Sequence, residues 1–255
     1  MKNLSKNMTL VAALTLAMTA VCDSAMAQDA VAAPAAAEAV ADNVVSYNVA
    51  LSSDYRYRGV SQSRLDPAIS AGADYTHNPT GLYVGTWLSS IKWIKDSGGD
   101  TNLEWDIYAG KRGEISKDFT YDVGGLYYFY PSNGLSTNAN TFELYGQLGY
   151  GPAYIKYSHS TTNLFGVADS KNSGYLDVGA NIDVHDGYIL NLHAGRQKVE
   201  HNDALSYNDY KIGVSKDFGV ATVALAAVKA NITLLAPNGK NLAKSGLVLT
   251  VSKTF

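Results

Sequence analysis

Few residues of this chain have the types and spacing that catalysis or metal binding requires. Its five histidines show neither the H-E-x-x-H spacing nor another metal-ligand pattern, and its one cysteine, Cys22, lies near the amino terminus. Ser158 and His159 could suggest a serine nucleophile with a histidine base, as in a lipid hydrolase. Adjacent residues of a strand point to opposite faces, however, so these two side chains cannot serve each other. We therefore expect no enzyme, no catalytic or metal-binding residue and no cofactor.

Charged side chains recur instead at alternate positions of short stretches, with apolar side chains between them. In residues 45–58, one face begins with Val45 and includes Tyr55 and Tyr57, whereas the opposite face is polar. If the apolar face meets lipid, the polar face lines a water-filled interior. The candidate pore-lining residues are Asp54, Arg56, Arg58, Asp74, Glu104, Asp106, Asp122, Glu143, Lys156, Asp177, Asp183, His193, Asp209 and Lys211.

The same two-residue period predicts about twelve strands, an even number such as bacterial outer-membrane barrels have. After the first strand, at residues 45–58, the expected strands are 68–76, 82–93, 102–112, 119–130, 141–150, 152–159, 175–184, 188–200, 207–216, 220–231 and 245–255.

Short and long connectors alternate between these strands. Short ones such as 77–81 and 185–187 carry the Pro, Asn, Asp and Gly residues of tight turns, whereas 160–174 and 232–244 are much longer. A meander gives this alternation when one end of a barrel has periplasmic turns and the other has extracellular loops. The sequence therefore predicts an all-β, transmembrane, antiparallel up-and-down β-barrel with both termini in the periplasm.

The amino terminus has the features of a cleaved export signal. Lys2 and Lys6 precede an apolar run at residues 8–21, and an A-x-A cleavage site follows at residues 25–27. We expect residues 1–27 to be a signal peptide.

The remainder of the chain divides into two parts by composition. Residues 28–43 are rich in Ala and Val and predict a periplasmic linker, and residues 44–255 predict the barrel itself. The net charge of the whole chain is −3, and no basic stripe is present, so nucleic-acid binding is not expected.

A secreted soluble β protein would also show alternating strands, and three features argue against it. Charged residues make up only 17% of the chain, which is low for strands that face water. The 18 tyrosines and 3 tryptophans gather near strand ends, as in aromatic girdles at membrane interfaces. The last strand alternates cleanly and ends on the aromatic residue Phe255. The girdle residues expected at one end are Tyr47, Tyr75, Tyr83, Phe119, Tyr121, Tyr150, Tyr188 and Phe218, and at the other Tyr57, Trp93, Trp105, Tyr128, Tyr130 and Tyr207.

Five segments also resemble a known family. The segment 53–63 (SDYRYRGVSQS) resembles the signature near the start of the TorF-type porin family of Gram-negative bacteria, and its second half is the most specific part. Residues 67–72, 81–87, 104–110 and 121–127 fit the same pattern. The resemblance implies an outer-membrane barrel assigned as a porin. It implies no particular substrate and no catalytic residues.

The expected function is passive diffusion of small hydrophilic solutes or ions through a narrow channel in the bacterial outer membrane. Acids outnumber bases among the candidate lining residues, which predicts a mild preference for cations. The expected partners are outer-membrane lipids, the solutes, and the barrel-assembly machinery, which would act through the strand that ends in Phe255. Two alternatives stay open: a closed structural or adhesive barrel whose long loops bind partners, and, more remotely, an outer-membrane lipid hydrolase.

Overall fold

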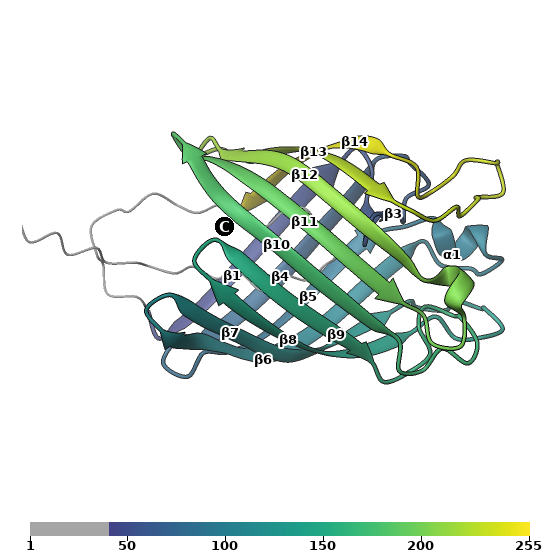
Figure 1. The fold of residues 1–255 in the computed structure, drawn as a ribbon, viewed down its shortest axis with the longest axis horizontal. Helices are drawn as coiled ribbons and strands as arrows, with labels where there is room; N and C mark the ends of the chain where they lie inside the picture. The colour runs from purple at the N-terminus through teal and green to yellow at the C-terminus, as the bar shows by residue number, and fades with distance from the viewer. Residues whose placement is uncertain (1–40) are drawn as a thin grey trace, which may run out of the picture.

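Twelve antiparallel strands form one closed barrel in the computed structural model, which describes residues 41–255 (Figure 1). The expected signal peptide and nearly all of the expected linker lie outside the described residues. The barrel strands are β1 (Asn43–Ser52), β4 (Ala68–His77), β5 (Leu82–Ser90), β6 (Leu103–Ser116), β7 (Phe119–Phe129), β8 (Thr141–Tyr150), β9 (Ala153–Ser160), β10 (Gly174–His185), β11 (Tyr188–Lys198), β12 (Tyr207–Asp217), β13 (Thr222–Ala230) and β14 (Gly246–Thr254).

Each barrel strand pairs with its neighbour along the chain, and β1 closes the barrel by pairing with both β4 and β14. The prediction of an antiparallel up-and-down barrel of about twelve strands is therefore confirmed. Two short helices lie in the connectors, α1 (Trp93–Asp96) and η1 (Asp203–Leu205). Between Ala41 and Phe255, no helix has both the length and the apolar character to cross a membrane.

The alternating pattern separates an apolar outer surface from a largely polar interior. Strand β14 shows this separation. Its outward side chains are Leu247, Leu249 and Val251, which are 71%, 47% and 41% exposed, and its inward side chains include Thr250 and Ser252, which are 2% and 8% exposed. A soluble barrel would place its polar phase outside. The observed arrangement is the one that a barrel in a bilayer requires, because its outer wall meets hydrocarbon.

The first strand is shorter than the sequence pattern predicted. β1 ends at Ser52, and the chain then turns into the barrel and forms a separate two-stranded sheet of β2 (Arg56–Tyr57) and β3 (Val60–Ser61). We call residues 53–67 the inner hairpin. The prediction that Tyr55 and Tyr57 face lipid is wrong, since these residues are only 5% and 7% exposed.

The two aromatic girdles are confirmed only in part. Several large aromatic side chains exposed on the barrel wall lie toward the end with short turns, namely Tyr47, Tyr75, Phe119, Tyr150, Tyr188 and Phe218, and fewer lie toward the other end, namely Trp105, Tyr157 and Tyr210. In contrast, Tyr83, Tyr128, Tyr130 and Tyr207 are buried inside the barrel and Trp93 lies in α1, so their assignment to girdles is wrong. Their position in the alternation places the four tyrosines on the inward phase.

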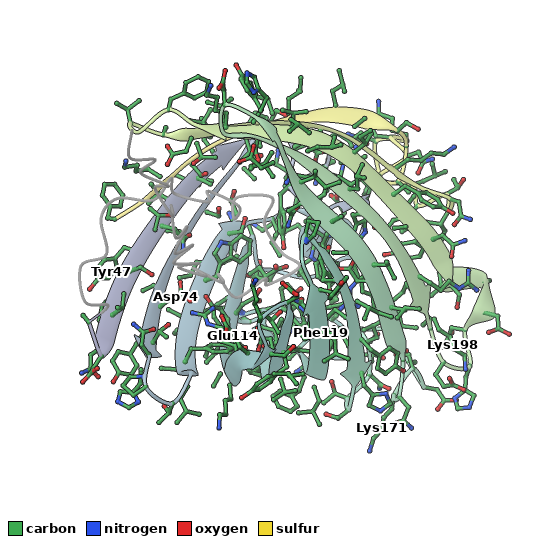
Figure 2. All side chains as sticks on the ribbon, turned by 60° about the vertical axis from the view of Figure 1, so that its left-hand side comes forward. Tyr47, Asp74, Glu114, Phe119, Lys171 and Lys198 are labelled. Atoms are coloured by element: carbon green, nitrogen blue, oxygen red, sulfur yellow. The ribbon has the colours of Figure 1, made fainter. Side chains whose placement is uncertain are left out.

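Both ends of the described chain lie at the end of the barrel that carries the short turns (Figure 1). The backbone N–H of Phe255 donates to the carbonyl of Tyr47 at 2.8 Å, and the N–H of Tyr47 donates back at 3.1 Å. These bonds join β1 to the terminal residue. The long loops and α1 lie at the opposite end, which we call the loop end (Figure 1). Figure 2 shows Lys171, in one of the long loops, well apart from Tyr47.

Glycines make room for tyrosine rings on the inner wall. A Cβ added to Gly85, Gly110, Gly124, Gly179 or Gly195 would collide with a tyrosine on an adjoining strand. Glycine leaves the backbone uncovered, and the neighbouring ring covers it, so the two residues together fill the pleated surface.

We predict that Gly195→Ala destabilises the barrel, because the new methyl group would overlap the Tyr175 hydroxyl and approach the Asp209 carboxylate within 2.7 Å. Overpacking of this kind costs about 1–3 kcal/mol of unfolding free energy. Gly146→Ala is the matched control, since the nearest atom to its Cβ would be 3.9 Å away. Urea unfolding of the micelle-folded protein measures both, and equal midpoints for the two variants would contradict the packing argument.

Candidate functional site in the barrel interior

The inner hairpin is held in its own fold by the carboxylate of Asp54. This carboxylate accepts hydrogen bonds from the hydroxyls of Ser61 at 2.5 Å and Ser63 at 3.1 Å, and it forms an ion pair with Arg56. Arg58 and Gly59 both have positive φ, at 45° and 78°, and make the turn. A side chain at Gly59 would come within 2.6 Å of the Asp209 Cβ on the far wall, so only glycine fits this close approach.

Arg58 at the tip of the inner hairpin joins the hairpin to the barrel wall. Its guanidinium donates to both carboxylate oxygens of Glu143 on β8, at 2.7 and 3.1 Å, and to the amide oxygen of Gln197 on β11 at 2.7 Å. The same group lies 4.1 Å from the ring centroid of Tyr175 and 4.7 Å from that of Tyr57. A planar guanidinium suits this combination of a two-point ion pair and ring stacking.

Arg56 ties the inner hairpin to the long loop at residues 231–245. Its guanidinium donates to the carbonyl of Lys244 at 3.0 Å and to that of Leu242 at 3.2 Å. The backbone N–H of Ser61 donates to the same Leu242 carbonyl at 2.9 Å. The hairpin and this loop therefore form one connected structure at the loop end of the barrel.

The two tyrosines of the hairpin form hydrogen bonds with side chains on strands β6 and β7. The Tyr55 hydroxyl donates to Glu104 on β6 at 2.6 Å, and Tyr130 donates to the other oxygen of Glu104 at 2.9 Å. Tyr57 and Tyr128 share a hydrogen bond of 2.9 Å. The hairpin thus contacts strands on several sides of the barrel and narrows the interior there.

A second group of interior charges is paired on the wall strands β10 to β12. His193 lies between two carboxylates, with Nδ1 2.8 Å from Asp177 and Nε2 2.7 Å from Asp209. The Tyr175 hydroxyl donates to Asp209 at 3.0 Å. Within residues 41–255, no group of three or more His, Cys, Asp or Glu side chains has the arrangement to hold a metal ion.

Tyrosine hydroxyls bond to two further carboxylates, and a lysine contacts a ring. Tyr108 donates to Asp74 and Tyr83 donates to Asp122, each at 2.6 Å. The ammonium of Lys156 lies 4.6 Å from the Tyr145 ring centroid. The charged side chains of the interior are therefore in contact with tyrosine hydroxyls and rings.

Charged loop residues at the loop end are also paired. Lys92 donates to Asp66 at 2.7 Å, Lys240 lies 3.5 Å from the same carboxyl group, and Arg64 pairs with Asp96. The hydrogen bond from Lys92 holds the pKa of Asp66 below its usual value.

Most of the predicted pore-lining residues lie on the inward phase of the barrel, and three of them belong to the inner hairpin. Asp54, Arg56 and Arg58 are buried inside the barrel on the hairpin and are not part of a wall strand. Asp183 is exposed beside the short turn after β10, where a bulge shifts the strand register. The others on the inward phase are Asp74, Glu104, Asp106, Asp122, Glu143, Lys156, Asp177, His193, Asp209 and Lys211.

The predicted lining residues do not include the aromatic side chains that face the interior. Trp87, Tyr108 and Tyr175 are each at most 5% exposed and were not among the predicted lining residues. A signal for them was present in the strand period. Tyr83 and Trp87 alternate with Leu82 and Val84 in the sequence, which places them on the inward phase of β5.

The fold defines the class of protein, a porin-like barrel. A solved structure described as "KdgM porin" superposes with a TM-score of 0.53 at 7% identity, covering 83% of this chain and 97% of that one. A second, described as a NanC porin structure, gives a TM-score of 0.51 at 10% identity, covering 83% and 98%. At this identity the likeness concerns the fold.

The family follows from the sequence itself. Residues 36–255 match the profile of the family described as "Bacterial protein of unknown function (Gcw_chp)", and the chain belongs to that family. No curated protein is similar in sequence to this chain. The more specific resemblance to the TorF-type porin family stays a prediction.

We predict that the Arg58 and Glu143 pair holds the inner hairpin in place. Glu143→Ala leaves a buried guanidinium without its carboxylate, which lowers the unfolding free energy by about 3–5 kcal/mol. Replacing both residues, as in Arg58→Met with Glu143→Leu, removes the uncompensated charge and costs less than the single change. Urea unfolding measures both variants, and a double variant less stable than the single one would contradict the pairing.

Proposed function

We propose that this protein is a passive channel for small hydrophilic solutes or ions in the bacterial outer membrane, narrowed at the loop end by the inner hairpin. The observation that carries the proposal is a closed barrel whose outer wall is apolar and whose interior holds the charged side chains. A charged and hydrated interior suits polar solutes, and the hairpin limits their size.

The proposal includes the placement of the protein in the cell. Residues 1–27 direct export, the end with the short turns and both described chain ends faces the periplasm, and the loop end faces outward. The terminal strand that ends in Phe255 is the segment recognised by the barrel-assembly machinery, and outer-membrane lipids cover the apolar wall. The transport is diffusive, and the chain is not an enzyme. The TorF-type resemblance of residues 53–63 supports the same assignment.

We predict that the purified protein gives steady conductance steps in a planar lipid bilayer. Removing the tip side chains in Tyr57→Ala with Arg58→Ala increases the step size, because both side chains lie inside the barrel. Tyr47→Ala on the outer wall is the control and leaves the step unchanged, provided that all three proteins show heat-modifiable migration on a gel. Persistent silence of the folded protein would favour a closed barrel and contradict the channel.

We also predict a mild preference for cations. Arg58 is paired with Glu143 and Arg56 with Asp54, while His193 is flanked by two carboxylates. The interior therefore keeps an excess of acidic groups, and charged side chains in a narrow pore bias its ions. Reversal potentials in a salt gradient measure this preference. Asp74→Asn with Asp122→Asn reduces it, and anion preference in the unaltered protein would contradict the prediction.

A further inference from the structure

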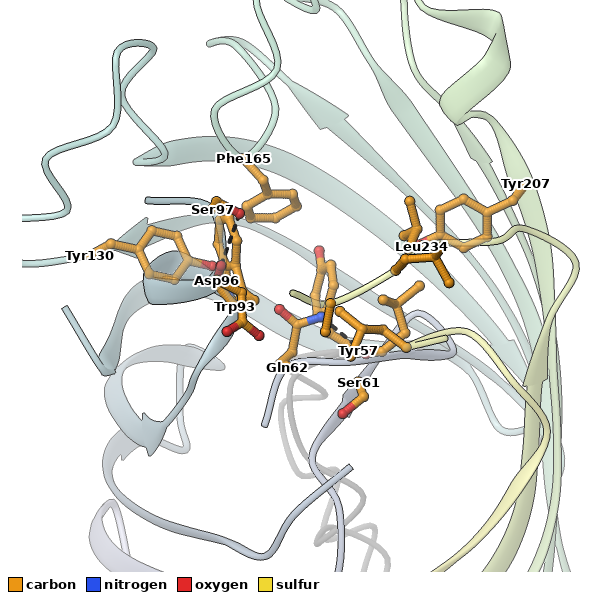
Figure 3. Close-up of a pocket in the computed structure, with 14 residues that line it drawn as sticks. Tyr57, Ser61, Gln62, Trp93, Asp96, Ser97, Tyr130, Phe165, Tyr207 and Leu234 are labelled. Atoms are coloured by element: carbon orange, nitrogen blue, oxygen red, sulfur yellow. Dashed lines mark hydrogen bonds between the residues drawn. The ribbon is translucent and has the colours of Figure 1, made fainter. Parts of the chain in front are cut away.

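A cavity of about 300 Å³ lies at the loop end, directly on the inner hairpin (Figure 3). Four segments that are far apart in the sequence surround it: the inner hairpin, the segment around α1, the loop at residues 161–173 and the loop at residues 231–245. Tyr130 after β7 and Tyr207 at the start of β12 complete the wall.

Aromatic rings line opposite sides of this cavity. Trp93 and Tyr130 contact edge to face with centroids 5.2 Å apart, and Tyr57 contacts Phe165 in the same way at 5.3 Å. Tyr207 lies across the hollow from Phe165 (Figure 3). Such rings offer broad apolar surfaces with defined edges, which favour a flat partner over a flexible chain.

The polar groups in the wall are few and mostly engaged. Asp96 is the one charged residue lining the cavity, and it is paired with Arg64. The hydroxyl of Ser61 donates to Asp54, that of Ser97 donates to the carbonyl of Trp93, and the Gln62 amide donates to the carbonyl of Val60. These walls offer little to an ion or to a solute with many hydroxyl groups, because its polar groups would lose water without replacement.

One donor in the wall has no acceptor. The indole Nε1 of Trp93 is buried and makes no hydrogen bond to any residue from 41 to 255. This nitrogen has almost no accessible surface, so a ligand in the cavity meets the ring of Trp93 and not its donor.

We propose that this cavity is a binding site for an uncharged aromatic solute of about two fused rings. The size follows from a comparison: an apolar protein cavity of about 150 Å³ holds one benzene molecule, and this one is about twice as large. The assignment of the site rests on the geometry of the cavity, and its use as an entry site for solutes rests on the proposed channel.

Coumarin is a suitable probe, because it is a flat bicyclic aromatic molecule without charge. We expect isothermal titration calorimetry to show binding to the full-length mature protein in nanodiscs, with empty nanodiscs as the blank. Glucose is the contrasting probe, and we expect no binding. In the bilayer, coumarin is expected to reduce the ion current in proportion to its occupancy.

Two pairs of variants locate the site. Tyr207→Ala removes an aromatic wall and weakens coumarin binding about tenfold, as a lost ring contact of about 1.4 kcal/mol would. Tyr210→Ala on the outer face of the same strand is its control and has no effect. Trp93→Ala removes a second ring of the lining and weakens binding about tenfold. Trp105→Ala, on the outer wall, leaves binding unchanged.

The outcomes separate this inference from the proposed channel. Absence of coumarin binding to the folded protein, equal binding by Tyr207→Ala and the unaltered protein, or glucose binding as tight as that of coumarin would each overturn the site. Coumarin binding that depends on Tyr207 in a protein without conductance would uphold the site and refute the channel. Conductance without coumarin binding would uphold the channel and refute the site.

Discussion

The structure depends on the requirement that no backbone N–H or C=O group on the wall be left without a partner in lipid. An open sheet has two edges of unpaired groups, and here β1 removes both by pairing with β4 on one side and β14 on the other. The bonds between Tyr47 and Phe255 extend this closure to the last residue. Closure also fixes the side of every side chain, because alternate residues must point outward or inward.

A barrel of this size encloses more volume than its wall side chains fill, and the chain supplies a segment of its own to occupy part of it. The inner hairpin brings two arginines into the interior, where an unpaired charge would be costly. Each is neutralised locally, Arg56 by Asp54 within the hairpin and Arg58 by Glu143 on the wall. These pairs hold the hairpin inside the barrel.

The interior has two zones of different chemistry. Toward the end with the short turns, glycines and tyrosines alternate with carboxylates such as Asp74 and Asp122. At the loop end, the hairpin and the long loops bring Tyr57, Trp93 and Phe165 together into an aromatic cavity. The aromatic cavity and the carboxylate-rich wall therefore occupy different parts of the interior.

The sequence by itself determined the class of fold, because a period of two residues can be detected within each strand without knowledge of its neighbours. It predicted twelve strands whose ends mostly agree with the structure to within one or two residues, as for β8 (Thr141–Tyr150). It also placed residues such as Glu143 and Asp209 on the inward phase.

Only the tertiary structure decided where residues 53–67 lie. The alternation of residues 53–58 is the same as that of a wall strand, but the ladder between β1 and β14 ends at Ser52 and Thr250. The chain then leaves the wall and reverses at Arg58 and Gly59 inside the barrel. The partners that hold it there are remote in sequence: Glu143 is 85 residues from Arg58, and Gln197 is 139 residues away. Local periodicity carries no information about such contacts, because they exist only after the barrel has closed.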